Sequence, residues 1–203
     1  MLTIGEIAKA AGCTVIDRNL RWDNAVLSAY ADVLQEADDD TTIYGIELRE
    51  DISPPAHYRS IDHHGDRQQQ PSALEQVATL LGISLSRRQQ LIAANDRGYI
   101  PAMQALGATP EEIDAIRHAD RAAQGVTPQD EQMAEEAIAN TAIRHNDLII
   151  VHSATSHFST ITDRLYPYRR LLIYTDREIV YYGTDRDKII TLFRQHTSGS
   201  NIY

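Results

Sequence analysis

The chain has 203 residues, with 29 acidic and 19 basic residues and a formal net charge of −10. Apolar residues make up 42% and charged residues 24%, a mixture that excludes wholesale disorder. The acidic balance argues against a surface that coats duplex nucleic acid, because that mode of binding neutralises many phosphates.

The sequence also predicts a protein that does not enter membranes. No apolar run approaches the ~18 residues needed to cross a bilayer, and the first residues lack the basic and apolar regions of a signal peptide. A single cysteine, Cys13, cannot form an internal disulfide. We therefore expect a cytoplasmic protein, either one medium domain or two small lobes; homo-oligomer formation is left open.

The first half of the chain alternates predicted strands and helices. Thr3 and Glu6 have the spacing of a capping box, and Gly12 marks the end of the short helix that they begin. Strands are then expected at 13–17, 42–48 and 57–61, and helices at 24–37, 72–81 and 86–95. This alternation predicts an α/β fold with a parallel sheet, whose chemistry lies beyond the carboxyl ends of the strands.

The second half predicts a smaller α/β lobe. Thr109-Pro110 and Thr127-Pro128 each indicate the start of a helix, and the second helix is expected to run to about Arg144. A strand at 147–152, a helix at 155–165, a hairpin of 170–174 with 178–182 and a helix at 185–196 follow. We expect a parallel-sheet lobe over 1–126, a connecting helix over 127–146 and a smaller mixed lobe over 147–203.

The motif Ser60-Ile-Asp-His-His-Gly65 directly follows the third predicted strand. An acid and two imidazoles at the carboxyl end of a strand can point into one pocket, and divalent transition metals favour this mixture of ligands. Isolated tripeptides of this kind are also common as structural or solvated residues. The rest of the chain therefore decides between the two interpretations.

The sequence resembles the DHH phosphoesterase superfamily, which is named for the tripeptide Asp62-His63-His64. Its members hydrolyse phosphoesters and phosphoanhydrides, from pyrophosphate to short oligonucleotides and cyclic dinucleotides. The resemblance extends to Ser72–Ala78 after the tripeptide, to the later acidic motif at Ala93–Gly98, to the first motif at Asn19–Ala25 and to Glu47, which matches a metal-bridging aspartate. Ser198–Asn201 stands where the family enters a Gly-rich phosphate-binding stretch.

The resemblance implies a metal site of altered composition. One ion, manganese or magnesium, would be held by Asp23, Glu47, His63 and Asp96. Ligands of the family's second ion correspond here to Arg18 and Arg21, so one ion is expected rather than two. The implied catalytic residues are His64 on the phosphate, Asp62 as an orienting group and Arg21 as a charge-neutralising group; the implied substrate-binding residues are Arg18, Asn19 and Arg97.

Two functions remain open at this point. The first is metal-dependent hydrolysis of a phosphoester or phosphoanhydride in a small nucleotide or short oligonucleotide. The second is a catalytically degenerate protein of this type that binds a phosphate-containing ligand or a partner subunit. Trp22, beside Asp23, would favour a nucleotide if it stacks on a base, but it could equally be a buried anchor.

Overall fold

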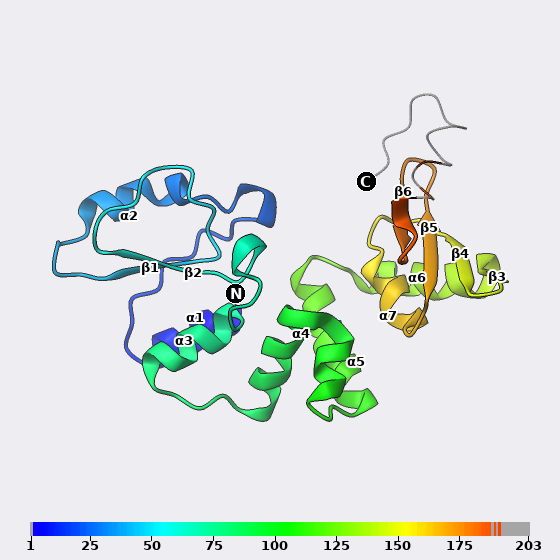
Figure 1. Cartoon of the computed structure of the whole chain (residues 1–203), viewed down its shortest axis with the longest axis horizontal. Coiled ribbons are helices and arrows are strands. Elements are labelled where there is room, and N and C mark those ends of the chain that lie inside the picture. The colour runs from blue at the N-terminus through cyan, green and yellow to red at the C-terminus, as the bar shows by residue number, and fades with distance from the viewer. Residues whose placement is uncertain (1, 188, 190, 192–203) are drawn as a thin grey trace. The chain divides into compact units, whose positions relative to one another are not determined.

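The computed structural model describes residues 2–187, 189 and 191 and has a mixed α/β fold (Figure 1). The chain divides into two compact units, Met1–Ile116 and Arg117–Tyr203, and the division falls within α5 (Pro110–Ala123). Within the described residues, no helix has the length and apolar character needed to span a membrane.

The first unit holds a two-stranded parallel sheet. Its regular elements are α1 (Leu2–Ala10), α2 (Ala31–Glu36), β1 (Ile43–Ile46), β2 (Tyr58–Ile61), α3 (Ala73–Leu81) and α4 (Arg87–Ala105), with the short 3-10 helices η1 (Trp22–Asn24), η2 (Leu27–Tyr30) and η3 (Gly65–Arg67). β1 and β2 lie side by side (Figure 1), and their register pairs Gly45 with Ser60 and Ile46 with Ile61. Both strands therefore end at the same level, and the residues that follow them meet.

Two amphipathic helices cover this sheet. Ser72 caps α3 through a capping box with Glu75, and the helix then buries residues at helical spacing on one face. The helices α1 and α3 pack together with β2 around one core, which consists of Ile4, Ile7, Ile61, Ala73, Leu74, Val77 and Ala93. α3 is thus packed against β2, the strand that leads into the Asp-His-His motif.

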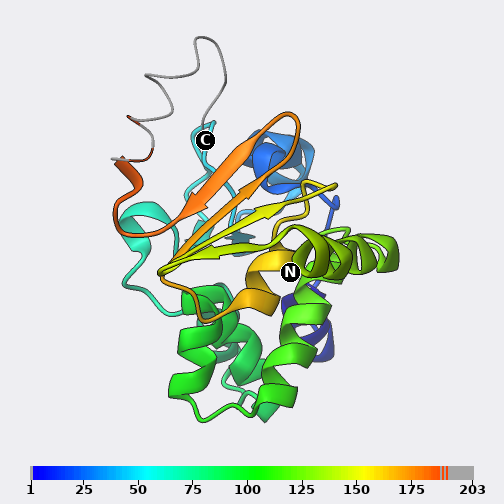
Figure 2. The same ribbon diagram turned by 90° about the vertical axis from the view of Figure 1, so that its right-hand side faces the viewer.

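The second unit is a four-stranded sheet with helices on one face (Figure 2). Its elements are the end of α5, α6 (Pro128–Thr141), β3 (Ile143–His145), β4 (Leu148–His152), α7 (Ser159–Leu165), β5 (Arg170–Tyr174) and β6 (Ile179–Tyr182). The strand order is β3-β4-β5-β6, in which β4 and β5 run parallel and the outer pairs run antiparallel.

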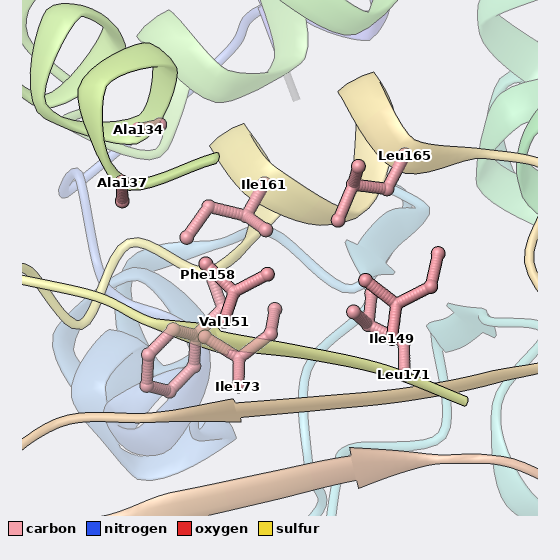
Figure 3. Packing of buried hydrophobic residues seen from close by; sticks show 9 residues of the cluster. All are labelled: Ala134, Ala137, Ile149, Val151, Phe158, Ile161, Leu165, Leu171 and Ile173. Carbon is pink, nitrogen blue, oxygen red and sulfur yellow. The ribbon is translucent and has the colours of Figure 1, made fainter. Parts of the chain in front are cut away.

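Alternating residues of β4 and β5 form the core of the second unit (Figure 3). Val151 and Ile173 are fully buried there, and α6 and α7 contribute Ala134, Ala137, Ile161 and Leu165 to the same cluster. The small alanines of α6 allow that helix to lie close to the sheet. α6 is therefore part of the packing of this unit.

Several predicted elements differ from the structure. The strand expected at 13–17 is wrong: the segment is irregular and mostly exposed, because no neighbouring strand pairs with it. The helix expected to run to Arg144 ends at Thr141, and β3 follows it. The helix expected at 86–95 continues to Ala105, across non-helical residues at Gly98 and Tyr99. The last expected helix lies mostly outside the described residues, and Ser198–Asn201 lies entirely outside them.

Candidate metal centre

The candidate site lies where β1 and β2 end. Glu47 directly follows β1, and Asp62, His63 and His64 directly follow β2. The backbone N–H of Glu47 donates to the carbonyl of Ile61 at 2.8 Å, which extends the parallel pairing by one residue. Glu47 has a left-handed backbone with φ of 53°, a conformation that costs energy for a residue with a side chain. The change of backbone direction therefore falls on the residue that carries the carboxylate.

His63 lies between two carboxylates. Its side chain is only 6% exposed; Nδ1 is 3.5 Å from Oε1 of Glu47, and Nε2 is 3.5 Å from Oδ2 of Asp96, which α4 supplies. Nδ1 is buried and has no hydrogen-bond partner. A buried polar atom in this state is costly unless something else satisfies it.

His64 is oriented by its neighbour Asp62. The His64 Nδ1 atom is 2.9 Å from Oδ1 of Asp62, and the backbone N–H of His64 donates to the same oxygen at 3.0 Å. Gln76 of α3 holds this segment in turn, since its Nε2 donates to the carbonyl of Asp62 at 3.1 Å. With Nδ1 engaged, Nε2 is the nitrogen of His64 that can bind a further group.

Three side chains converge closely enough to hold an ion. Ligand atoms of Glu47, His63 and His64 all lie within 4.8 Å of one another. The centroids of the two imidazole rings are 4.2 Å apart. Each imidazole also has one nitrogen beside an aspartate, His63 beside Asp96 and His64 beside Asp62. Carboxylates commonly orient metal-binding histidines in this way.

The carboxylates of the site differ in their proton affinity. Burial raises the pKa of Glu47 above its ordinary value, the charge of Asp96 raises it further, and the two histidines oppose the rise. Burial also raises the pKa of Asp62, but the hydrogen bonds from the ring and backbone of His64 outweigh it, so that pKa is lowered overall. Asp62 is thus suited to remain a charged partner of His64, whereas the charge of Glu47 requires compensation.

The residues of the first motif lie in an exposed turn. Asp23 belongs to η1 and is exposed, and it is not a member of the group formed by Glu47, His63 and His64. Arg21 precedes the same turn and is also exposed. Trp22 is 69% exposed, so it is not a buried anchor, and its ring contacts the ring of His64 with centroids 4.5 Å apart.

The three expected substrate-binding residues have other contacts. Arg18 pairs with Asp32 at 2.5 Å and donates to the carbonyl of Ala29 at 2.7 Å. Asn19 lies in a positive-φ turn at 52°, where its N–H donates to Asp17. Arg97 pairs with Glu75 at 3.2 Å and so joins α4 to α3.

The sequence did not reveal which contacts support the motif. The role of Gln76 was not predicted, although it lies in the first turn of the next α-helix after Asp62–His64, which is a usable signal. Asp62 was expected as an orienting group, and it contacts His64. The orienting contact of Asp96 with Nε2 of His63 was not predicted, since it depends on which ring nitrogen faces which carboxylate. Comparisons of the chain with models of known protein families, with curated proteins and with solved structures find no match.

Proposed function

We propose that the protein is a metal-dependent hydrolase of phosphoesters or phosphoanhydrides, and that Glu47, His63 and His64 hold one divalent ion. The observation that carries the proposal is the buried Nδ1 of His63, which has no hydrogen-bond partner and faces Oε1 of Glu47 at 3.5 Å. A cation bound between them would satisfy the nitrogen and compensate the buried carboxylate. The resemblance of the surrounding motifs to the DHH superfamily adds the expectation of phosphoester chemistry.

The donor set favours manganese over magnesium. Magnesium prefers oxygen ligands and keeps several waters, whereas imidazole nitrogens suit transition ions. Three protein ligands would leave coordination positions for water and substrate, as in catalytic rather than structural sites. A bound ion would supply an activated water and polarise a phosphoryl oxygen.

The other residues of the site act around this centre. Asp96 lies beside Nε2 of His63 and Asp62 beside Nδ1 of His64, so that Nδ1 of His63 and Nε2 of His64 would be the nitrogens that hold an ion. This proposal gives His64 a ligand role in place of the phosphate contact that the resemblance implied, and it gives Asp96 an orienting role. Arg21, exposed beside Trp22, would hold phosphate oxygens through its planar guanidinium.

Manganese titration of single-residue variants tests the site. Wild type should bind about one ion per chain, and Asp23→Ala should bind equally well. His63→Ala and His64→Ala should each lose binding, because they remove nitrogen ligands. His145→Ala, which changes an exposed histidine of β3, is the matched control and should bind as wild type does.

Hydrolysis is tested separately with the same preparations. Manganese-loaded wild type should hydrolyse a generic phosphodiester or pyrophosphate, and His63→Ala should not. Equal metal content in wild type and His63→Ala would refute the ligand set. A metal-loaded protein without turnover on either substrate would refute the hydrolase and leave the non-catalytic alternative.

A further inference from the structure

Trp22 places an exposed aromatic ring next to the candidate metal centre. Its indole is 69% exposed and lies against the His64 ring, with centroids 4.5 Å apart and an interplanar angle of 63°. The His64 ring is in turn 4.2 Å from the ring of His63. One imidazole therefore separates the indole from the buried histidine between Glu47 and Asp96.

The turn that carries Trp22 is held together without the indole. The backbone N–H of Arg21 donates to Oδ1 of Asn24 at 2.7 Å, and the N–H of Asn24 donates to the carbonyl of Arg21 at 3.0 Å. The following residues are joined to the segment after β1, since the N–H of Arg49 donates to the carbonyl of Ala25 at 3.0 Å. These hydrogen bonds hold the turn from which the indole extends to His64, while most of the surface of Trp22 stays accessible.

We propose that Trp22 is a stacking platform for the base of a nucleotide, and that it gives the site a preference for nucleoside phosphates over inorganic phosphates. This inference rests on the proposed function, because it assumes that the phosphate binds at the Glu47–His63–His64 group. A nucleotide carries its base one sugar away from the phosphate, and Trp22 contacts His64, whose ring lies between the indole and His63. Stacking on an aromatic side chain accepts any base, because every base has a π face.

The positive charge of Arg21, next to Trp22, also suits a nucleotide. Arg21 directly precedes Trp22 and is exposed, so a cation and an aromatic surface lie together on one turn. Proteins that bind single-stranded nucleic acid combine these two features. An inorganic phosphate would use the cation alone, so the aromatic ring is the feature that separates the two ligand classes.

A pair of ligands that differ only in the base tests the inference. Adenosine 5′-monophosphate and ribose 5-phosphate carry the same phosphate and sugar, and their dissociation constants can be measured by calorimetry on the 203-residue chain with saturating manganese. Wild type should bind the nucleotide about tenfold or more tightly than the sugar phosphate, as base stacking on an aromatic residue predicts. Fluorescence gives a second readout, because Trp22 is the only tryptophan of the chain and should respond to the nucleotide more strongly than to the sugar phosphate.

Substitutions at Trp22 locate the effect. Trp22→Ala should bind adenosine 5′-monophosphate and ribose 5-phosphate about equally, with unchanged manganese affinity, and Trp22→Phe should keep most of the difference. Tyr44→Ala removes an exposed aromatic residue of β1 and serves as the matched control, with no expected effect on either ligand. An equal loss for both ligands in Trp22→Ala would mean that the indole only positions His64, and it would overturn the inference.

The outcomes separate this inference from the proposed function. If manganese binds and both ligands bind with the same affinity in wild type, the metal site stands and the stacking platform is refuted. If adenosine 5′-monophosphate is preferred through Trp22 but no phosphoester is hydrolysed, the platform stands and the hydrolase is refuted. If neither ligand binds, the inference fails.

Discussion

The phenol of Tyr58 in β2 occupies the space that a side chain at Gly45 in β1 would need. A Cβ atom placed on Gly45 would lie 2.0 Å from Oη of Tyr58 and 2.6 Å from two of its ring carbons. Tyr58 is buried, and its strand leads directly into the Asp-His-His motif. The absence of a side chain at residue 45 therefore permits the packing of the two strands that bring Glu47 and His63 together.

Gly45→Ala should destabilise the first unit by about 1–3 kcal/mol, because the overpacked ring has to move. Gly5→Ala is the matched control: it lies within α1, and its Cβ would meet only Val15 Cγ1, at 3.9 Å. That substitution should stabilise the protein by about 0.5–1 kcal/mol, since alanine favours a helix over glycine. Urea denaturation followed by Trp22 fluorescence measures both, and an unchanged stability of Gly45→Ala would show that Tyr58 moves aside freely.

A buried group of charges joins α5, α6 and α7 in the second unit. Arg117 donates to both oxygens of Asp163, at 3.0 and 3.1 Å, and Arg121 donates to Asp163 and to Glu131. Both arginines and Asp163 are almost fully buried. Breaking such a group by removing one partner is costly, because the remaining charges stay in a poorly solvated place.

Asp163→Asn should therefore lower the free energy of unfolding by about 3–5 kcal/mol. The control is Glu135→Gln, which alters a 66% exposed partner of Arg164 and should change stability by less than about 1 kcal/mol. Thermal unfolding followed by far-UV circular dichroism compares the two variants. Similar melting temperatures would show that the buried charges are solvated well enough to tolerate the loss.

Asp130 should make the stability of the second unit depend on pH. Hydrogen bonds from the side chain and backbone of Thr127, reinforced by Thr155 and His157, hold the pKa of Asp130 well below its ordinary value. A carboxyl whose pKa is lowered by folding stabilises the folded state fully above the unfolded pKa of about 4, and that contribution is lost gradually as the pH falls from there through the lowered folded pKa.

Asp130→Asn should accordingly lower stability at pH 7, by about 1 kcal/mol, and by progressively less as the pH falls below about 4, with the smaller deficit measured at pH 2. Asp176→Asn, at a 97% exposed carboxyl of the same unit, should show neither effect. Melting temperatures at the two pH values measure the difference. A deficit of the same size at both pH values would indicate that the asparagine disturbs the cap of α6 by its shape rather than by its charge.

The sequence predicted regular elements better than it predicted the segments between them. β1, β2, α3 and the hairpin of β5 with β6 lie where hydrophobic alternation and capping residues placed them. The prediction of a strand at 13–17 was wrong because β-branched residues suit a strand only when a neighbouring strand pairs with them. β3 was missed because it is three exposed residues long and has no apolar pattern.

The same distinction applies to the candidate site. Glu47, His63 and Asp96 were expected to lie together, and the structure brings them together, since each follows or belongs to a regular element that the pattern located. Asp23 lies in the three-residue helix η1 and Arg18 in an irregular stretch, where side-chain positions depend on local hydrogen bonds rather than on periodicity. The contact of Arg18 with Asp32 and the exposure of Asp23 could not be read from spacing for that reason.

Glu47→Gln tests directly whether the buried carboxylate of Glu47 binds a cation. Burial raises the pKa of Glu47, so in the metal-free protein its ionised form destabilises the fold as the pH rises through the ordinary carboxyl range. The amide keeps the shape and removes the charge. Without metal, the variant should therefore melt at a higher temperature than wild type at pH 7, and this advantage should shrink as the pH is lowered through that range.

With manganese the order of the two proteins should reverse. An ion whose free concentration is about one hundred times its dissociation constant adds about 2.7 kcal/mol to the free energy of unfolding of a protein that binds it only when folded. Wild type should gain this and Glu47→Gln should not, because the amide is a much weaker ligand. Glu50→Gln, which alters a more exposed carboxylate that follows the same strand, should respond to manganese as wild type does. A Glu47→Gln protein that is less stable without metal, or that keeps the full response to manganese, would show that this carboxylate serves the fold and not an ion.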